Sequence, residues 1–517
     1  MLSRLFRNLS QHGHTLEGLE PRSMLSADLA ISVGTLKEGF DRTGNQNLKL
    51  PVTVVNAGDL PLQGGGSIDY FLSLDRTLDG SDFRFASTAL PNVRGAGSSG
   101  TITLNTLKPA LLAPRVGHAV PSGQYFIIAH VVTNRQGADS NTSNDTAATT
   151  STIDINYAFG NVNGKPNVPL TVTMPNGNTV TFSLRGLGFG QVVNADGRIF
   201  VALQGTTTQS LFRIDPAKRN LGASISGLTV NGSLKELIAD RIGVDGNVTI
   251  SGAVGKVILG NIAHSTFQIN GFGVDVSIQL GQVTDSSLTS RTPIRSLTVD
   301  RWRDTDLTPD TLSTPYIETL SSHGDFEAGV STTTSHKGFS IKRLVTSGHI
   351  SGTWSVRGSV NELQVGSIAA DFTGTFRGVL NSVMVRGNAG GTFGSGNIKR
   401  MIVGGNLVGA TYLAGASLGA NGVLDGTSVD DTFTAAHIGL IEVRGQMINS
   451  NVAAGMQTTD GIIGNSDDQL ASSGQIDTII VKHGIINSHF ITAHMPTRAN
   501  VLFKNISTAG NSVFISG

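Results

Sequence analysis

Two aspartate-rich loops near the C-terminal end of the sequence contain the side chains with the most specific chemistry. The first spans residues 421–431 and the second spans residues 460–468, and each combines glycine turns with a terminal pair of aspartates. Their acidic residues are Asp425, Asp430, Asp431, Asp460, Asp467 and Asp468. Clustered carboxylates with backbone carbonyls are ligands for a hard cation, so the loops predict calcium, and the sequence indicates no other cofactor. Aspartates that only close solvated turns would explain the same residues without a metal.

Composition excludes several other kinds of site. The chain has no cysteine, which rules out disulfides, thiolate metal sites and cysteine nucleophiles. Lysine plus arginine and aspartate plus glutamate are both 37, so the net charge of zero gives no general attraction to nucleic acid. No apolar run reaches the roughly 20 residues that span a bilayer. We assign no catalytic residue.

The aspartate loops lie within a series of short apolar segments at near-constant spacing. The segments begin at Ile341, Val360, Leu380, Ile398, Ile438 and Ile476. The steps between them are 19, 20, 18, 40 and 38 residues, so the last two steps are each interpreted as about two periods. A repeat of about 20 residues built from strand-forming residues is typical of a solenoid. The sequence therefore predicts that the loops project from a stack of coils.

Within each segment the first, fourth and sixth positions are mainly apolar. Stacking of the coils predicts one continuous inner row along the core, formed by Leu344, Leu363, Val383, Met401, Ile441 and Ile479. Glycine follows several segments, where we expect a corner with unusual backbone angles. The period favours a right-handed parallel β-helix over a propeller, whose blades need about 40–45 residues.

Residues 28–155 show the pattern of an all-β sandwich, with alternating apolar segments separated by turn residues. The segment contains five landmarks in order: Asp28-Leu29, Val55-Asn56-Ala57-Gly58, Tyr70-Phe71-Leu72-Ser73-Leu74-Asp75, Pro121-Ser122-Gly123-Gln124-Tyr125 and Asn141-Thr142-Ser143-Asn144-Asp145. These landmarks resemble the bacterial cell-adhesion-related Ig-like (CARDB) domain. The resemblance implies an Ig-like fold and an association with adhesion.

The first 27 residues contain a short motif that suggests export. Residues 19–27, Leu-Glu-Pro-Arg-Ser-Met-Leu-Ser-Ala, resemble the LEPR-XLL motif of large exported surface proteins in planctomycete-type bacteria, with Met24 at a position where leucine is commoner. The resemblance implies an extracellular or cell-surface location. The predicted organisation is an export segment at 1–27, a CARDB-like sandwich at 28–155, a strand-rich linker and cap at 156–233, and the β-helix at 234–517.

The functional expectation is a non-catalytic structural or adhesion protein that presents a rigid surface to a glycan, a matrix or another cell. The alternative is a carbohydrate-active enzyme, a polysaccharide lyase or hydrolase, because β-helices commonly carry such sites. That alternative predicts converging carboxylates with aromatic platforms for sugars, for which Trp302 and Trp354 are the available tryptophans. A third hypothesis is a subunit of a larger assembly whose coil ends stack on neighbours.

Overall fold

The computed structural model describes residues 26–516, apart from 41–45, 63–64, 94, 108–122, 135–138, 156, 163, 175–176, 196–197, 218–221, 420, 464–466, 471–473, 502–504 and 510–511. The export motif predicted within residues 1–27 therefore lies outside the described residues, except for Ser26 and Ala27. The chain divides into two compact units whose boundary falls between Ile155 and Asn156.

The protein is all-β, as the sequence predicts. In the described residues the helical content is a single short 3-10 turn, Thr142–Asn144. No helix in the described part of the chain is long and apolar enough to cross a membrane.

The first unit consists of two sheets. In one sheet β3 pairs antiparallel with β1 and with β6, and β2 lies at an edge. In the other sheet β4 pairs antiparallel with β5 and with β7, and β7 also pairs with β8 and β9. The strands are β1 (Leu29–Val33), β2 (Lys37–Phe40), β3 (Gln46–Asn56), β4 (Gly66–Ser73), β5 (Phe83–Ala89), β6 (Ser99–Leu107), β7 (Gly123–Thr133), β8 (Thr146–Ala148) and β9 (Ile153–Ile155). Every second residue of β3 from Leu48 to Val54 is fully buried, which is the alternation expected of a strand with one covered face.

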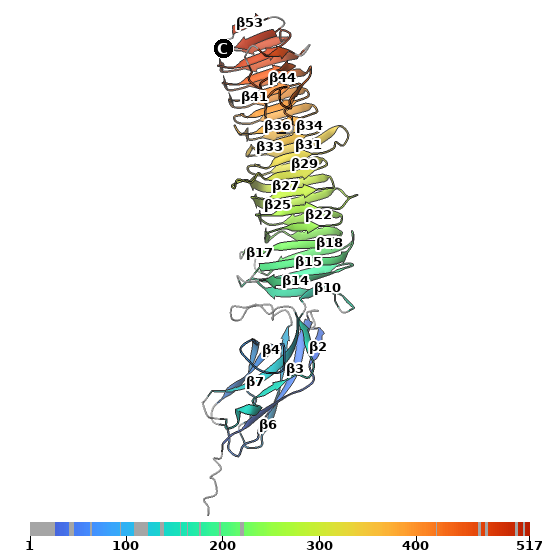
Figure 1. The fold of residues 1–517 in the computed structure, drawn as a ribbon, viewed down its shortest axis with the longest axis vertical. Coiled ribbons are helices and arrows are strands. Elements are labelled where there is room, and N and C mark those ends of the chain that lie inside the picture. Colours follow the sequence, from blue (N-terminus) through green and yellow to red (C-terminus); the bar gives the residue numbers. More distant parts are fainter. Residues whose placement is uncertain are drawn as a thin grey trace, which may run out of the picture. The chain divides into compact units, whose positions relative to one another are not determined.

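The second unit is a parallel β-solenoid of about 14 turns, and Figure 1 shows its strands stacked one above another. It starts with antiparallel strands β10 (Ala158–Val162), β11 (Lys165–Val168), β12 (Leu170–Thr173), β13 (Thr179–Arg185) and β14 (Phe189–Ala195). Strands β12 and β13 form a hairpin, in which Leu170 pairs with Phe182 and Val172 with Val180. Parallel pairing begins with β15 and β16, ahead of Leu234, where the repeat first becomes visible in the sequence.

The coils form a ladder stack and a flank stack, and some coils add a short corner strand. The ladder strands carry the apolar segments of the repeat: β16 (Leu211–Pro216), β19 (Leu234–Ala239), β22 (Val254–Leu259), β25 (Val276–Thr284), β27 (Ile294–Arg303), β29 (Ile317–Ser322), β31 (Phe339–Thr346), β34 (Ser359–Val365), β37 (Leu380–Val385), β39 (Ile398–Val403), β44 (His437–Val443), β49 (Gln475–Val481) and β52 (Arg498–Val501).

The two other stacks consist mainly of shorter strands. The corner strands are β17 (Ala223–Ile225), β20 (Ile242–Asp245), β23 (Ile262–Ala263), β32 (His349–Ile350), β35 (Ser367–Ile368), β40 (Leu407–Val408), β45 (Met447–Ile448) and β50 (Ile485–Ile486). The flank strands are β15 (Arg198–Thr206), β18 (Gly227–Gly232), β21 (Val248–Ile250), β24 (Thr266–Ile269), β26 (Ser287–Ser290), β28 (Thr311–Thr314), β30 (Gly329–Thr332), β33 (Thr353–Val356), β36 (Thr373–Phe376), β38 (Thr392–Ser395), β41 (Thr411–Ala414), β46 (Asn451–Ala454) and β51 (His489–Thr492). The flank sheet ends with the antiparallel strands β53 (Asn505–Ala509) and β54 (Ser512–Ser516).

The predicted inner row is confirmed by the strand register. Leu344 pairs with Leu363, Leu363 with Val383, and the row continues through Met401 to Ile441 and Ile479. All six side chains are buried. The row also shows that Met401 and Ile441 are neighbours in adjacent coils, although 40 residues separate them. The interpretation of the 40- and 38-residue steps as two periods each is therefore wrong: each step is one coil that carries an insertion.

The solenoid core contains a continuous series of aromatic rings. Trp302 contacts Phe326 in edge-to-face geometry with ring centroids 5.4 Å apart, and Phe326 contacts Trp354 at 6.3 Å. The series continues through Phe372, Phe376, Phe393 and Tyr412. Edge-to-face and offset pairs of this kind stabilise a core beyond the area that they bury.

Glycines form a column at the corner that follows the ladder strands. Glycine is required at these positions for a different reason from the one predicted. Gly348, Gly387, Gly405 and Gly445 do not have a positive φ. A Cβ on Gly445 would instead lie 2.6 Å from the carbonyl oxygen of Gly405 in the preceding coil. Successive glycines are joined by backbone hydrogen bonds, such as that from Gly445 N to Gly405 O at 2.9 Å. Close approach of neighbouring coils, rather than unusual backbone angles, requires glycine here.

Candidate functional site

The two aspartate loops lie in insertions that leave the solenoid from successive coils. We call residues 415–436 the first excursion and residues 455–474 the second excursion. The first begins and ends with the antiparallel pair β42 (Ala416–Ser417) and β43 (Thr432–Phe433), and the second with β47 (Met456–Gln457) and β48 (Gln469–Leu470). The coils themselves continue without interruption, because β39 pairs directly with β44 and β44 with β49.

The two excursions pack against each other and against the flank sheet. Thr427 N donates to Thr458 O at 3.1 Å, and Ser428 donates to Thr459 O from its backbone N at 3.2 Å and from Oγ at 2.6 Å. Beneath these bonds the partly buried side chains of Leu424, Phe433 and Ile463 pack on a buried cluster of Leu413, Ala416, Ala453, Met456 and Ile491. The excursions therefore have an apolar base of their own and form one projection rather than two independent loops.

The structure brings together the three predicted acids of the first excursion. One carboxylate oxygen from each of Asp425, Asp430 and Asp431 lies within 4.8 Å of the others. Asp431 is only 4% exposed, and its Oδ2 accepts from the backbone N of Asp425 at 2.8 Å and of Gly426 at 2.7 Å. Burial raises the pKa of Asp431, and the neighbouring carboxylates of Asp425 and Asp430 act in the same direction. The first excursion thus gathers negative charge in a partly buried place.

The acids of the second excursion act mainly as turn acceptors. Asp460 Oδ1 accepts from Ile462 N at 2.8 Å and from Thr458 Oγ1 at 3.2 Å, as in an Asx turn. Asp467 Oδ2 accepts from Thr459 N at 2.8 Å, and this backbone bond is the main reason why the pKa of Asp467 is lowered. Within the described part of the chain, no group of three clustered metal ligands includes these residues.

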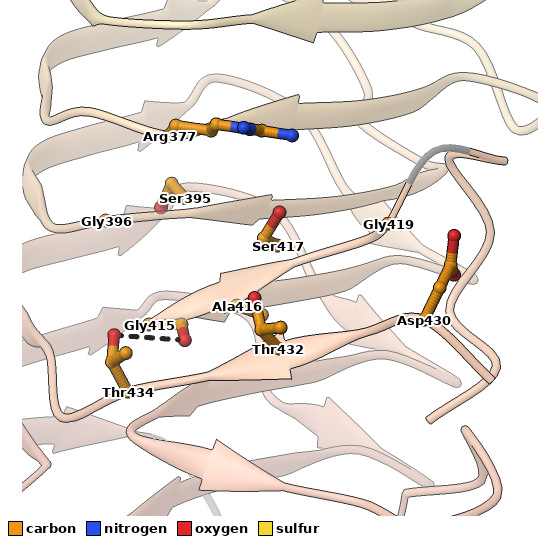
Figure 2. A pocket seen from close by; sticks show the side chains of 10 residues that line it. All are labelled: Arg377, Ser395, Gly396, Gly415, Ala416, Ser417, Gly419, Asp430, Thr432 and Thr434. Atoms are coloured by element: carbon orange, nitrogen blue, oxygen red, sulfur yellow. Dashed lines mark hydrogen bonds between the residues drawn. The ribbon is translucent and has the colours of Figure 1, made fainter. Parts of the chain in front are cut away.

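A groove with a volume of about 560 Å³ lies beside the first excursion. We call it the flank groove. Its polar lining consists of Arg377, Ser395, Ser417, Asp430, Thr432 and Thr434. Figure 2 shows the hydroxyl groups of Ser417 and Thr432 and the carboxylate of Asp430 pointing toward the side of the groove on which Arg377 lies. The groove thus combines one guanidinium, one carboxylate and several hydroxyl groups.

Sequence reasoning missed the groove, and the register shows no clear signal for it. In the flank sheet Ser395 pairs with Phe376 of the preceding coil and with Ala414 of the following coil. Phe376 in turn pairs with Val356. The same row also contains Thr314 and Thr332, so a hydroxyl side chain at this position does not stand out in the sequence. Ser395 is fully buried and its Oγ has no hydrogen-bond partner among the described groups. An unpaired buried hydroxyl of this kind costs free energy unless a partner is supplied.

A second acidic site lies about five coils nearer the start of the solenoid. A pocket of about 300 Å³ is lined by His264, Asp285, Asp306 and Asp310, among other residues. Asp310 is 3% exposed, and its Oδ2 accepts from Trp302 Nε1 at 2.9 Å. Burial raises the pKa of Asp310 to about 6, whereas backbone hydrogen bonds, chiefly from Thr305 N, lower the pKa of Asp285. None of these four residues was predicted, because nothing in their spacing marks a motif.

We expect the replacement Asp310→Asn to remove part of the pH dependence of stability. In the folded chain the carboxyl group holds its proton up to about pH 6, but in the unfolded chain only to about pH 4. The folded state is therefore favoured by acidification between these values, and its stability falls as the pH rises through them. Urea denaturation at pH 5 and pH 7 should show a smaller difference in Asp310→Asn than in the unchanged chain. An equal difference in both proteins would contradict the assignment.

The tryptophans named as possible sugar platforms are not available for that role. Trp302 and Trp354 are each 1% exposed and belong to the aromatic series of the core. Of the five tyrosines, Tyr70, Tyr125, Tyr157 and Tyr412 are also buried. Tyr316 alone is half-buried, and its ring stacks on His336 with centroids 5.0 Å apart. The described solenoid therefore exposes neither tryptophan, and Tyr316 is its one partly exposed tyrosine.

A further half-buried group of ligand types surrounds His349. Its Nδ1 lies 3.0 Å from Asp325 Oδ1, and its Nε2 lies 3.1 Å from Glu327 Oε1. Glu327 Oε2 also accepts from Asp304 N at 3.1 Å. Both ring nitrogens thus lie within hydrogen-bond distance of a carboxylate, and the contacts join neighbouring coils.

Comparison with known proteins gives little further information. No protein-family model matches the chain, and no curated protein matches it. Three solved structures of β-glucosidase 3B from Thermotoga neapolitana, in complex with glycerol, glucose or α-D-glucose, show 14–16% identity over 23% of this chain. Their TM-score is 0.15, and the chain spans only 15–16% of the length of that glucosidase. Such a likeness carries no argument about activity.

Proposed function

We propose that this protein is a non-catalytic extracellular structural and adhesion protein that presents ligand-binding features on a rigid β-helical surface. Support for rigidity comes from the continuous register of the ladder and flank strands and from the aromatic series in the core. In a solenoid each coil contacts mainly its neighbours, so a stack holds surface features at fixed intervals. The resemblances to the CARDB domain and to the LEPR-XLL motif support export and a role at the cell surface.

The flank groove carries this proposal. Its guanidinium and its hydroxyl groups provide donors for a polyhydroxylated ligand, and the fork of Arg377 suits a carboxylate or sulfate in particular. An anionic polysaccharide has both hydroxyl and acid groups, and it is abundant in matrices around cells. We therefore assign the groove to an acidic glycan.

The groove is not equipped for hydrolysis of a glycosidic bond. Hydrolysis of a glycosidic bond generally needs two carboxyl groups on opposite sides of the scissile bond, about 5–10 Å apart. Among the described residues that line the groove, Asp430 is the one carboxylate. This set of side chains therefore supports binding rather than hydrolysis.

A carbohydrate-active enzyme is the second candidate, and one observation favours it. Asp285 and Asp310 line one pocket and have pKa values displaced in opposite directions. A protonated carboxyl group beside an ionised one is the arrangement that acid–base catalysis on sugars uses. The pocket lies away from the flank groove, and no exposed tryptophan accompanies it.

Binding of the full chain to immobilised polysaccharides tests the proposal. We expect saturable binding to alginate or to a sulfated galactan, and none to neutral dextran. Arg377→Ala should weaken binding at least tenfold, because it removes the cation of the groove. Arg357→Ala is the matched control: Arg357 is exposed, follows Val356 as Arg377 follows Phe376 in the next coil, and does not line the groove. Equal losses in both variants, or binding to dextran alone, would contradict the proposal.

A further inference from the structure

The acids of the first excursion are left with unused hydrogen-bonding capacity. Oδ1 of Asp425 and Oδ1 of Asp431 are both buried and accept no hydrogen bond from any described group. The other oxygen of each residue is satisfied, since Asp425 Oδ2 accepts from Asn421 Nδ2 at 2.6 Å and Asp431 Oδ2 accepts from two backbone N–H groups. Two orphaned carboxylate oxygens of a tight acidic group point to a positively charged partner.

Asp430 completes the group from the exposed side. Its carboxylate packs against Gly419, which has a φ of +58°, and a Cβ at that glycine would lie 2.0 Å from Asp430 Oδ1. The missing side chain at Gly419 thus makes room for this carboxylate. Because Asp431 is buried, Asp425 is half-buried and Asp430 is exposed, the group is closed on the core side and open toward the groove. Asp430 belongs both to the acidic group and to the lining of the flank groove.

The donor set selects the kind of cation. All three side chains are carboxylates, and a hard cation with oxygen ligands is their normal partner. Zinc would be expected to have histidine or cysteine ligands, and neither is part of the group. Magnesium requires nearly ideal octahedral geometry, whereas calcium accepts the irregular geometry of a loop.

We propose that a calcium ion binds between Asp425, Asp430 and Asp431 and fixes one wall of the flank groove, so that ligand binding in the groove depends on calcium. The wall is the pair β42–β43, in which Ala416 lies opposite Phe433 and Ser417 opposite Thr432. Asp430 and Asp431 immediately precede β43, so an ion that holds them also holds Thr432 at the groove. The dependence of ligand binding rests on the function proposed above, whereas the ion site and the ordering of the wall do not.

Calcium alone is the first probe. Titration of calcium chloride into the metal-free full chain, followed by calorimetry, should show a site that Asp431→Asn weakens at least tenfold. Asp431→Asn is a conservative change, because the amide oxygen can still accept a hydrogen bond from Gly426 N. Asp430→Ala provides a second variant, which carries little risk to folding because residue 430 is exposed. Asp467→Asn is the control from the second excursion and should bind calcium as the unchanged chain does. Loss of the site in Asp467→Asn, or unchanged binding in both first-excursion variants, would overturn the proposal.

Hydrogen exchange measured by mass spectrometry tests the ordering of the wall without any glycan. Calcium should slow exchange at least severalfold over residues 415–434 in the unchanged chain and have no effect there in Asp431→Asn. Calcium binding without this protection would overturn the link to the groove.

The last arm compares alginate binding in calcium and in chelator. We expect chelator to weaken binding at least tenfold in the unchanged chain and to have no effect in Asp431→Asn, which should bind weakly in both conditions. Equal binding of the unchanged chain in both conditions would overturn the calcium dependence. If no polysaccharide binds in either condition, the proposed function fails, while the calorimetry and the exchange data still decide the ion site and its effect on the wall.

Discussion

Replacement of Trp354 by alanine is expected to lower the free energy of unfolding by about 3–5 kcal/mol, the usual loss when a large buried aromatic side chain is truncated. Trp354 is 1% exposed and contacts Phe326, Phe372 and Phe376, with ring centroids 5.5–6.4 Å apart. Its Nε1 also donates to the carbonyl oxygens of Ala328 and Ser351, both at 3.2 Å. The truncation leaves a cavity at the centre of the aromatic series and removes donors from two carbonyl groups.

Urea denaturation followed by circular dichroism measures this loss. Phe272→Ala is the matched control, because Phe272 is an aromatic residue of the solenoid that is 69% exposed. That variant should change the unfolding free energy by no more than about 0.5 kcal/mol. If the two variants were equally stable, the aromatic series would not be a major contributor to the core.

The second large effect is expected from Gly348→Ala. A Cβ at Gly348 would lie 2.5 Å from the backbone N of Asp325 and 2.6 Å from the backbone carbon of Gly324, both in the preceding coil. Because backbone atoms of a stacked coil cannot move aside as a flexible side chain can, the two coils must separate. We expect a loss of about 1–3 kcal/mol, as for other overpacked positions, measured as a lower urea midpoint.

Gly222→Ala provides the control for this prediction. An added Cβ at Gly222 meets no atom within 4 Å, and the φ of this residue is not positive. The variant should therefore be as stable as the unchanged chain or slightly more stable. Equal tolerance of alanine at both positions would show that close coil contact does not explain the glycine column.

The fold could be predicted in most respects because one local pattern repeats. Each coil buries the same positions of a six-residue strand, so the period identifies Leu344, Leu363 and Val383 as neighbours without knowledge of any long-range contact. The insertions could not be recognised in the same way. Each excursion is about as long as a coil, and its residues Leu424, Phe433 and Ile463 are apolar because they pack on the side of the solenoid. Length and hydropathy alone do not distinguish an added coil from a packed insertion.

The candidate site was predictable only in part. Clustered acids are visible in the sequence, and the structure gathers Asp425, Asp430 and Asp431 as one group. The different arrangement of the second excursion depends on backbone donors, such as Ile462 N and Thr459 N, that a sequence does not place. The flank groove joins Arg377, Ser395 and Asp430 from separate coils and an insertion, and no spacing rule relates them. Trp302 and Trp354 could be named from the sequence as possible sugar platforms, but composition does not say whether an aromatic residue faces solvent.

The central claim is binding without turnover, and it is tested most directly by measuring new chain ends in polysaccharides that the protein binds. The full chain would be incubated with alginate and with a sulfated galactan, and the release of reducing and unsaturated ends would be followed at pH 5 and pH 7. We predict saturable binding that Arg377→Ala weakens and no release of chain ends above that of the polysaccharide alone. Release by the unchanged chain that is lost in Asp310→Asn would contradict this account and identify the pocket of Asp285 and Asp310 as a catalytic site.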